Sequence, residues 1–187
     1  SDAQRLAIVA ALSVKGDLTG LGVIALGYNG AAPTATYNNG NTGGPFSAVI
    51  GIDVAGFNTT IDQSTLAGGT SFLGSVGGVN AATGVPGSSS ANFTGTLTPS
   101  GTFVAASSGF TSNPNAGNWY RLGGGTGVLN LNVANQLTGA NNVIFGAINN
   151  SNQGNSVGMV NGGGTVVLNQ ANNYSGYTVF NQGETVQ

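Results

Sequence analysis

The stretch that decides the fold is Gly163-Gly164-Thr165-Val166-Val167-Leu168-Asn169, because the chain carries a close copy of it upstream. The copy reads Gly124-Gly125-Thr126-Gly127-Val128-Leu129-Asn130. Each copy then runs into a polar turn with a glycine and a β-rich segment: Leu137-Thr138-Gly139 with Asn142-Val143-Ile144-Phe145, and Tyr174-Ser175-Gly176 with Tyr177-Thr178-Val179-Phe180. A unit that recurs after tens of residues usually forms stacked structure, because one unit cannot bury its apolar face alone.

The composition permits a buried core but leaves little charge for the surface. The 187 residues include 34 glycines, and 40% of the chain is hydrophobic. Only 4% is charged, where about 25% is typical. The three basic residues, Arg5, Lys15 and Arg121, are too few for a phosphate-binding surface, so we expect no nucleic-acid partner. No segment reaches the roughly 18 uninterrupted apolar residues of a membrane-spanning helix, so we expect no transmembrane segment.

Short apolar and β-branched runs between turn signals predict an all-β chain. Residues 2–13 fit either a short helix after a capping box or a buried strand. Long loops rich in Gly, Asn and Ser are expected at 29–45, 74–90 and 106–118. The strands expected before the duplicated region are residues 21–26, 46–54, 61–66, 70–73, 93–98 and 102–105.

Three features favour a β-solenoid over the alternative, a β-sandwich. A third Gly-Thr start, Gly101-Thr102-Phe103-Val104, lies 24 residues before Gly125, a spacing that suits one coil. Charge is missing from the strands, as expected where each strand is covered on both edges. Asparagine recurs at strand ends, where side-chain amides can stack into ladders and tolerate left-handed backbone.

Residues 162–187 resemble the autotransporter-associated β-strand repeat, whose pattern is roughly G-G-T-L-x-L-x-x-x-N-T-Y-x-G-x-T-x-I-x-x-G-T-L. Residues 123–146 are a poorer copy, and Glu184 departs from the pattern. The resemblance implies a right-handed parallel β-helix in a large, secreted or surface-displayed bacterial protein. The matching positions are Gly163, Gly164, Thr165, Leu168, Asn173, Tyr174, Gly176, Thr178, Val179 and Gly183.

We expect one continuous domain cut from a longer protein. Divergent solenoid coils with long loops occupy residues 1–118 in this interpretation, and the repeat-bearing coils occupy residues 119–187. The start at Ser1-Asp2 is interpreted as a mature or trimmed end, and residues 184–187 as a strand in progress.

The sequence predicts no catalytic, cofactor-binding or metal site. Histidine and cysteine are both absent, which removes the common nucleophile–base pairs and thiolate metal sites. Asp53 and Asp62 are the one pair that a polysaccharide-active β-helix enzyme could use, but a turn-capping Asp and a strand-end Asp explain them as well. No calcium-binding array is present. The glycine run 123–127 lacks the strand–helix context of a dinucleotide loop and predicts a tight corner.

Trp119, Tyr120 and Arg121 form a possible interaction patch, because two aromatic rings beside a guanidinium suit sugar stacking or protein docking. The simpler interpretation is a cap over a coil end. The expected function is a structural extracellular segment that acts as stalk, fibre or surface coat and self-associates, for example into filaments, at the bacterial cell surface. The alternative is an adhesin or carbohydrate-binding module that contacts a glycan or a host or cell surface through its loops.

Overall fold

The structure is a computed structural model that describes residues 23–26, 49–65, 69–76, 90–103, 110–125, 127–146, 164–181 and 184–187. For residues 23–26 and 184 it describes the backbone only. The described residues form strands and one 3₁₀ turn, η1 (Gln63–Thr65), so the chain is all-β as predicted. The interpretation of residues 2–13 and the expected loop at 29–45 lie outside the described residues.

The largest sheet, sheet A, has six strands, and each neighbouring pair is parallel. In spatial order they are β1 (Val23–Leu26), β2 (Val49–Ile52), β5 (Phe72–Ser75), β8 (Trp119–Leu122), β10 (Asn142–Phe145) and β12 (Thr178–Phe180).

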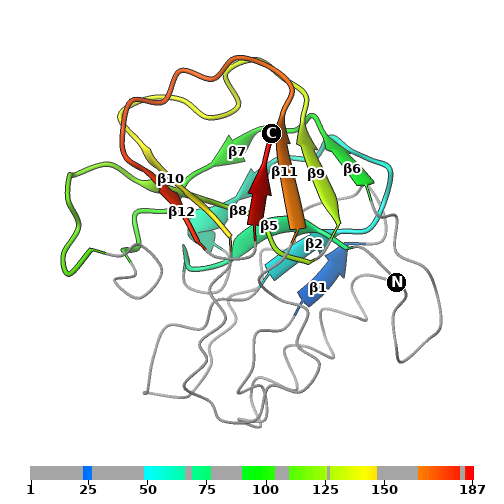
Figure 1. The fold of residues 1–187 in the computed structure, drawn as a ribbon, viewed down its shortest axis with the longest axis horizontal. Coiled ribbons are helices and arrows are strands. Elements are labelled where there is room, and N and C mark those ends of the chain that lie inside the picture. Colours follow the sequence, from blue (N-terminus) through cyan, green and yellow to red (C-terminus); the bar gives the residue numbers. More distant parts are fainter. Residues whose placement is uncertain are drawn as a thin grey trace, which may run out of the picture.

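Two further sheets are also parallel throughout (Figure 1). Sheet B consists of β13 (Glu184–Val186), β11 (Gly164–Leu168), β9 (Val128–Leu131), β6 (Ser90–Phe93) and β3 (Gly56–Phe57). Sheet C consists of β4 (Ile61–Asp62) and β7 (Leu97–Thr98).

The chain visits the three sheets in a repeating order. It passes through A, B and C in β2, β3 and β4, and again in β5, β6 and β7. From β8 to β13 it alternates between sheets A and B, and each new strand joins the sheet beside the strand that came one circuit earlier. This parallel pairing fits a parallel β-helix. It does not fit the sandwich alternative, whose two face-to-face layers consist of antiparallel strands.

The two copies of the repeat lie side by side, with a register that only partly follows the sequence alignment. Val143 pairs with Thr178 and Phe145 with Phe180, as the aligned copies predict. In the glycine–threonine halves, however, Thr165 pairs with Val128 rather than with Thr126. This shift is two residues, so it keeps every side chain on its own face of the sheet.

Several expected strands have different boundaries. The prediction that the third Gly-Thr start, at Gly101, begins a coil is wrong. Residues 101–103 form no strand, and β9 pairs with β6 rather than with a strand at that position. The expected strand 61–66 ends at Asp62, directly before η1. The expected strand 93–98 is split into β6 and β7, because the chain turns at Gly95, where a Cβ would collide with the Thr59 carbonyl oxygen.

The glycine run that looked like a dinucleotide loop is a corner, as predicted. Gly123, Gly124 and Gly125 have φ angles of 106°, 88° and 82°, a left-handed conformation that glycine adopts without steric cost. The corner also packs tightly against the neighbouring coil, because a Cβ on Gly74 would collide with the Gly124 carbonyl oxygen. A larger residue at Gly74 would push the corner at Gly124 away from β5.

Apolar side chains form two clusters, one on each face of sheet A. The inner core combines alternate residues of sheets A and B, such as Leu122, Phe145, Phe93 and Leu129, and each is at most 1% exposed. The opposite face of sheet A carries a smaller cluster, the outer cluster, with partly buried Phe103, Phe110 and Val179 packed against Val49, Phe72, Trp119 and Ile144.

Candidate functional sites: a buried arginine, an outer aromatic cluster and an open end

The structure does not place Trp119, Tyr120 and Arg121 at the surface. Their side chains are 0%, 2% and 0% exposed. Because successive side chains of a strand alternate, Tyr120 points into the inner core and Trp119 into the outer cluster. The expected interaction patch therefore lacks an accessible face, and these residues serve packing instead.

Arg121 lies in a buried polar cluster that joins three segments. Its Nη1 donates to the Gly69 carbonyl oxygen at 2.9 Å, and its Nη2 donates to the Thr102 carbonyl oxygen. Its Nε has no hydrogen-bond partner among the described residues. Burial lowers the pKa of the Arg121 guanidinium to about 10, since removal from water disfavours the charged form.

The backbone of Arg121 is bound by a side chain rather than by a strand. The Gln63 carboxamide accepts from the Arg121 N–H at 3.1 Å and donates to the Arg121 carbonyl oxygen at 2.6 Å. Beside it, Ser100 exchanges two backbone hydrogen bonds with Trp119, at 3.1 and 2.8 Å. The paired register between β5 and β8 is a single residue pair, Leu73 with Leu122. Gln63 and Ser100 thus complete the edge of β8 where β5 does not pair with it.

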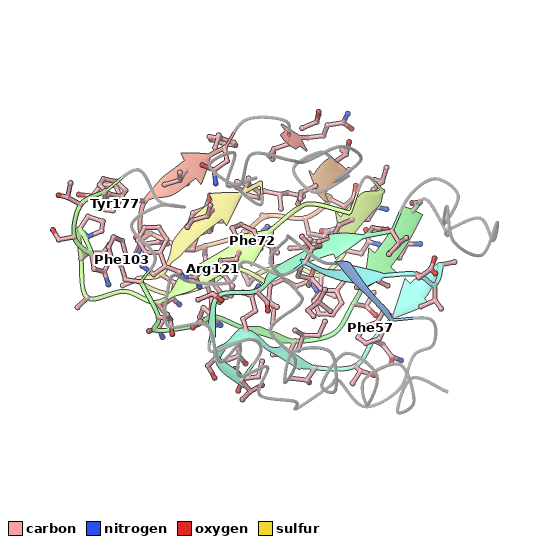
Figure 2. All side chains as sticks on the ribbon, turned by 90° about the horizontal axis from the view of Figure 1, so that it is seen from below. Phe57, Phe72, Phe103, Arg121 and Tyr177 are labelled. Carbon is pink, nitrogen blue, oxygen red and sulfur yellow. The ribbon has the colours of Figure 1, made fainter. Side chains whose placement is uncertain are left out.

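The outer cluster has an aromatic core that reaches the surface at one residue. Ring centroids lie 5.9 Å apart for Phe103 and Trp119, 6.4 Å for Phe110 and Trp119, and 5.3 Å for Phe110 and Tyr177. Figure 2 shows Phe103 and Tyr177 together toward one end of the molecule. Tyr177 is 48% exposed, while Trp119 is covered. An accessible ring next to a half-buried one is the part of this cluster that a ligand can touch.

Side-chain amides surround the outer cluster and hold its covering segment. Asn115 and Asn142 exchange two hydrogen bonds at 2.9 and 2.8 Å, and Asn142 also accepts from the Tyr177 N–H at 2.9 Å. The Trp119 Nε1–H donates to Asn113 at 3.3 Å. The fully buried Asn142 is therefore well satisfied, and the segment from Phe110 onward is fixed to the sheet.

An asparagine ladder runs across the coils of sheet B, as the sequence predicts. The Asn169 amide donates to Asn132 at 2.6 Å, and the Asn132 amide donates to Asn92 at 3.0 Å. The three residues come from three successive coils. The ladder satisfies uncharged polar groups at the surface and fixes the register of the coils against one another.

Among the described strands, β12 and β13 lie at the edges of sheets A and B, and together with the ring of Phe180 they form what we call the open end. Phe180 is 65% exposed, and its ring stacks on Phe145 with centroids 5.4 Å apart and planes 17° apart. The neighbouring core residues Leu168, Tyr174 and Val186 are only partly buried. In the described part of the chain, no strand pairs with the outer edge of β12 or β13.

Asp62, one of the two aspartates that a β-helix enzyme could use, holds the turn that follows it. Asp62 caps η1, since its Oδ1 accepts from the Ser64 N–H at 2.9 Å and from the Ser64 hydroxyl at 2.6 Å. This is the turn-capping role that the sequence allowed. Across the residues that the structure describes, no three His, Cys, Asp or Glu side chains gather to hold a metal, and no helix is long and apolar enough to cross a membrane.

No family model, curated protein or solved structure matches the chain. The resemblance of residues 162–187 to the autotransporter-associated repeat therefore stays a prediction. Sequence reasoning missed the outer cluster. Phe103 and Phe110 gave a weak signal for it, since both lie near an expected loop, where aromatic residues need something to pack against.

Proposed function

We propose that the chain is a segment of a right-handed parallel β-solenoid whose role is structural: a stalk, fibre or surface coat outside a bacterial cell. The observation that carries the proposal is the repeating order in which the chain visits the sheets, with each strand parallel to the strand one circuit earlier. Parallel connections of this kind are right-handed in nearly all proteins. Such a stack has a defined axis and grows by adding coils, as structural filaments and stalks require.

The chemistry of the described surface supports a structural role over an enzymatic one. The side chains that join the coils are amides and hydroxyls, and the residues best placed for chemistry are engaged in holding the stack: Asp62 caps η1, and Arg121 binds backbone carbonyls. The wide use of uncharged side chains also gives weak electrostatic repulsion between copies, which favours association.

Immunogold electron microscopy of the producing cells tests this role. We expect label outside the cell envelope, arranged on extended structures or over the surface. Label confined to the cytoplasm would contradict the proposal. Deletion of the gene should remove the labelled structure while growth continues, because a coat or stalk is not needed for metabolism.

A second candidate, glycan binding, is favoured by one observation. The Tyr177 ring is 48% exposed beside the half-buried Phe110, with amide-bearing residues 113, 115 and 118 nearby in the chain. Exposed aromatic rings stack on the apolar faces of sugars, and neutral amides bind hydroxyl groups. A glycan array with the wild type, Tyr177→Ala and the control Val133→Ala tests this. Binding that Tyr177→Ala alone removes would support it, and an array without any bound glycan would reject it.

A further inference from the structure

Neighbouring strands of sheet A are joined by ladders of different lengths. β2 pairs with β5 over four residues, and β8 pairs with β10 over four. Between these ladders, β5 and β8 share the single register pair of Leu73 with Leu122. The same two coils are paired over four residues in sheet B, through β6 and β9. The described stack is therefore firmly joined through sheet B and narrowly joined through sheet A at this place, which we call the junction.

Side chains replace part of the missing ladder at the junction. The Gln63 carboxamide binds both backbone groups of Arg121, and the Arg121 Nη1 binds the Gly69 carbonyl oxygen. Gln63 belongs to η1, and Gly69 lies in the segment before β5, so neither contact continues a strand. A region that is joined by few paired residues opens at a lower free energy than a fully paired one.

The closed junction also buries polar atoms that have no hydrogen-bond partner. Ser71 is 1% exposed and Arg121 is 0% exposed. Among the described residues, neither the Ser71 hydroxyl nor the Arg121 Nε finds a partner. The two residues lie on opposite sides of the junction, Ser71 directly before β5 and Arg121 within β8. A buried polar atom without a partner costs free energy that contact with water returns, so the junction opens at a reduced cost.

We propose that the junction is a hinge in the stack: sheet A opens between β5 and β8 while β6 and β9 stay paired in sheet B. The coils that end at β7 then tilt as one unit against the coils that begin at β8. Hinges of this kind depend on a few residues at the ends of rigid elements. The inference rests on the parallel stack and goes beyond the proposed structural role, because it gives a stalk or coat a defined place at which to bend.

Three equivalent backbone hydrogen bonds allow a direct test. In each bond, the residue that follows a strand of sheet A donates its N–H to a carbonyl oxygen of the neighbouring strand: Val76 to Ile52 at 3.0 Å, Gly123 to Leu73 at 2.7 Å, and Gly146 to Leu122 at 2.8 Å. The bond from Gly123 crosses the junction and is the shortest of the three. Gly123 and Gly146 are buried, while Val76 is half-buried. Bond length and burial alone therefore predict strong protection at Gly123, and the hinge predicts the opposite.

Amide hydrogen exchange of the purified chain, followed by NMR spectroscopy, measures how often each bond opens. We expect the protection factor of Gly123 to lie about tenfold or more below those of Val76 and Gly146. Fraying from either end of the stack cannot produce a minimum between these two positions. A protection factor at Gly123 that is not the lowest of the three would overturn the inference.

Gln63→Met tests the contacts that hold the hinge closed. The variant removes the bonds to the Arg121 backbone, so the protection of Gly123 should fall by about another tenfold while that of Val76 and Gly146 stays unchanged. Gln136→Met is the matched control. Gln136 is also buried, and its amide binds the Phe93 and Gly95 carbonyl oxygens beside the paired strands of sheet B, so its loss should leave Gly123 unchanged.

Circular dichroism of both variants shows that they have folded, and the comparison within the wild type stands without them. An effect of Gln63→Met that is equal at all three amides would reflect global unfolding and would contradict the hinge. These outcomes are separate from the failure of the proposed function. A rigid junction would leave the structural role outside the cell standing, and a cytoplasmic location would leave the hinge standing.

Discussion

Phe93 and Phe180 are the same residue type at the same kind of inner strand position, and they differ completely in burial. Phe93 is 0% exposed, while Phe180 is 65% exposed. Phe93 belongs to β6, which has β3 on one side and β9 on the other, whereas the described chain supplies β12 with a neighbour on one side only. The comparison teaches that burial in this protein depends on the number of adjoining coils. The local sequence pattern determines which face of the sheet a side chain occupies. The adjoining strands determine how far that side chain is buried.

The largest effect is expected in the middle of the stack. Phe93→Ala removes a fully buried ring that packs on Phe57, with ring centroids 6.2 Å apart, and leaves a cavity between two coils. We expect the free energy of unfolding to fall by about 3–5 kcal/mol, measured by urea denaturation. A loss below about 1 kcal/mol would mean that the inner core is not tightly packed around Phe93.

The next effect concerns Arg121, which joins the covering segments to sheet A. Arg121→Ala leaves the Gly69 and Thr102 carbonyl oxygens without these donors and creates a cavity, so we expect a loss of about 3 kcal/mol. Increased proteolysis near Gly69 and Thr102 should accompany it. Unchanged stability would show that the buried guanidinium contributes nothing to holding the segments around Gly69 and Thr102 against sheet A.

The same residue predicts a pH dependence in the alkaline range. Burial lowers the pKa of Arg121 in the folded state to about 10, below its ordinary value, so the unfolded chain binds the proton more tightly. Stability therefore rises with pH from about 10 up to the ordinary pKa of arginine, and the cost of burying the charge is fully present below pH 10. Relative to Arg121→Met, which cannot titrate, the wild type should gain about 1 kcal/mol by about pH 11. Denaturation curves of the pair at neutral pH and at that pH measure the difference, and a difference that stays constant would contradict it.

A smaller effect is expected in the asparagine ladder. Asn132→Ala interrupts the bonds to Asn92 and Asn169 at an accessible site, where water can replace them, so we expect a loss of about 1 kcal/mol. Thermal denaturation detects such a change. Asn173→Ala is a useful control, because Asn173 is an exposed asparagine outside the ladder and its replacement should leave the melting temperature almost unchanged.

The smallest effect is expected at the open end. Phe180→Ala removes a ring that is already mostly exposed, so stability should fall by less than about 1 kcal/mol. The ratio of the stability losses caused by Phe180→Ala and Phe93→Ala shows how strongly the stabilising effect of a ring depends on its burial. If the two losses were equal, both coils would be covered alike in solution.

Several features of the fold could be predicted from the sequence, because they depend on local patterns. The duplicated segments, the corner at Gly123–Gly125 and the asparagine ladder follow from local rules of backbone conformation and side-chain pairing. The register of β9 against β11 did not follow, because a shift of two residues keeps every side chain on the same face, so the alternation of the sequence does not distinguish the two registers. The role of Arg121 was also unpredictable, since its partners Gln63, Gly69 and Thr102 lie far away in sequence and two of them bind through backbone carbonyls.

Cysteine cross-linking tests the stacked parallel coils most directly, and the absence of native cysteine gives a clean background. Val128 and Thr165 are register partners on adjacent strands, within the Cα separation of a disulfide, so the Val128→Cys, Thr165→Cys variant should cross-link within the monomer on mild oxidation. Val128→Cys with Val167→Cys, the pair that the sequence alignment would favour, lies two residues out of register and should stay reduced. Efficient cross-linking of the second pair and not the first would contradict the register, and failure of both would contradict the stack itself.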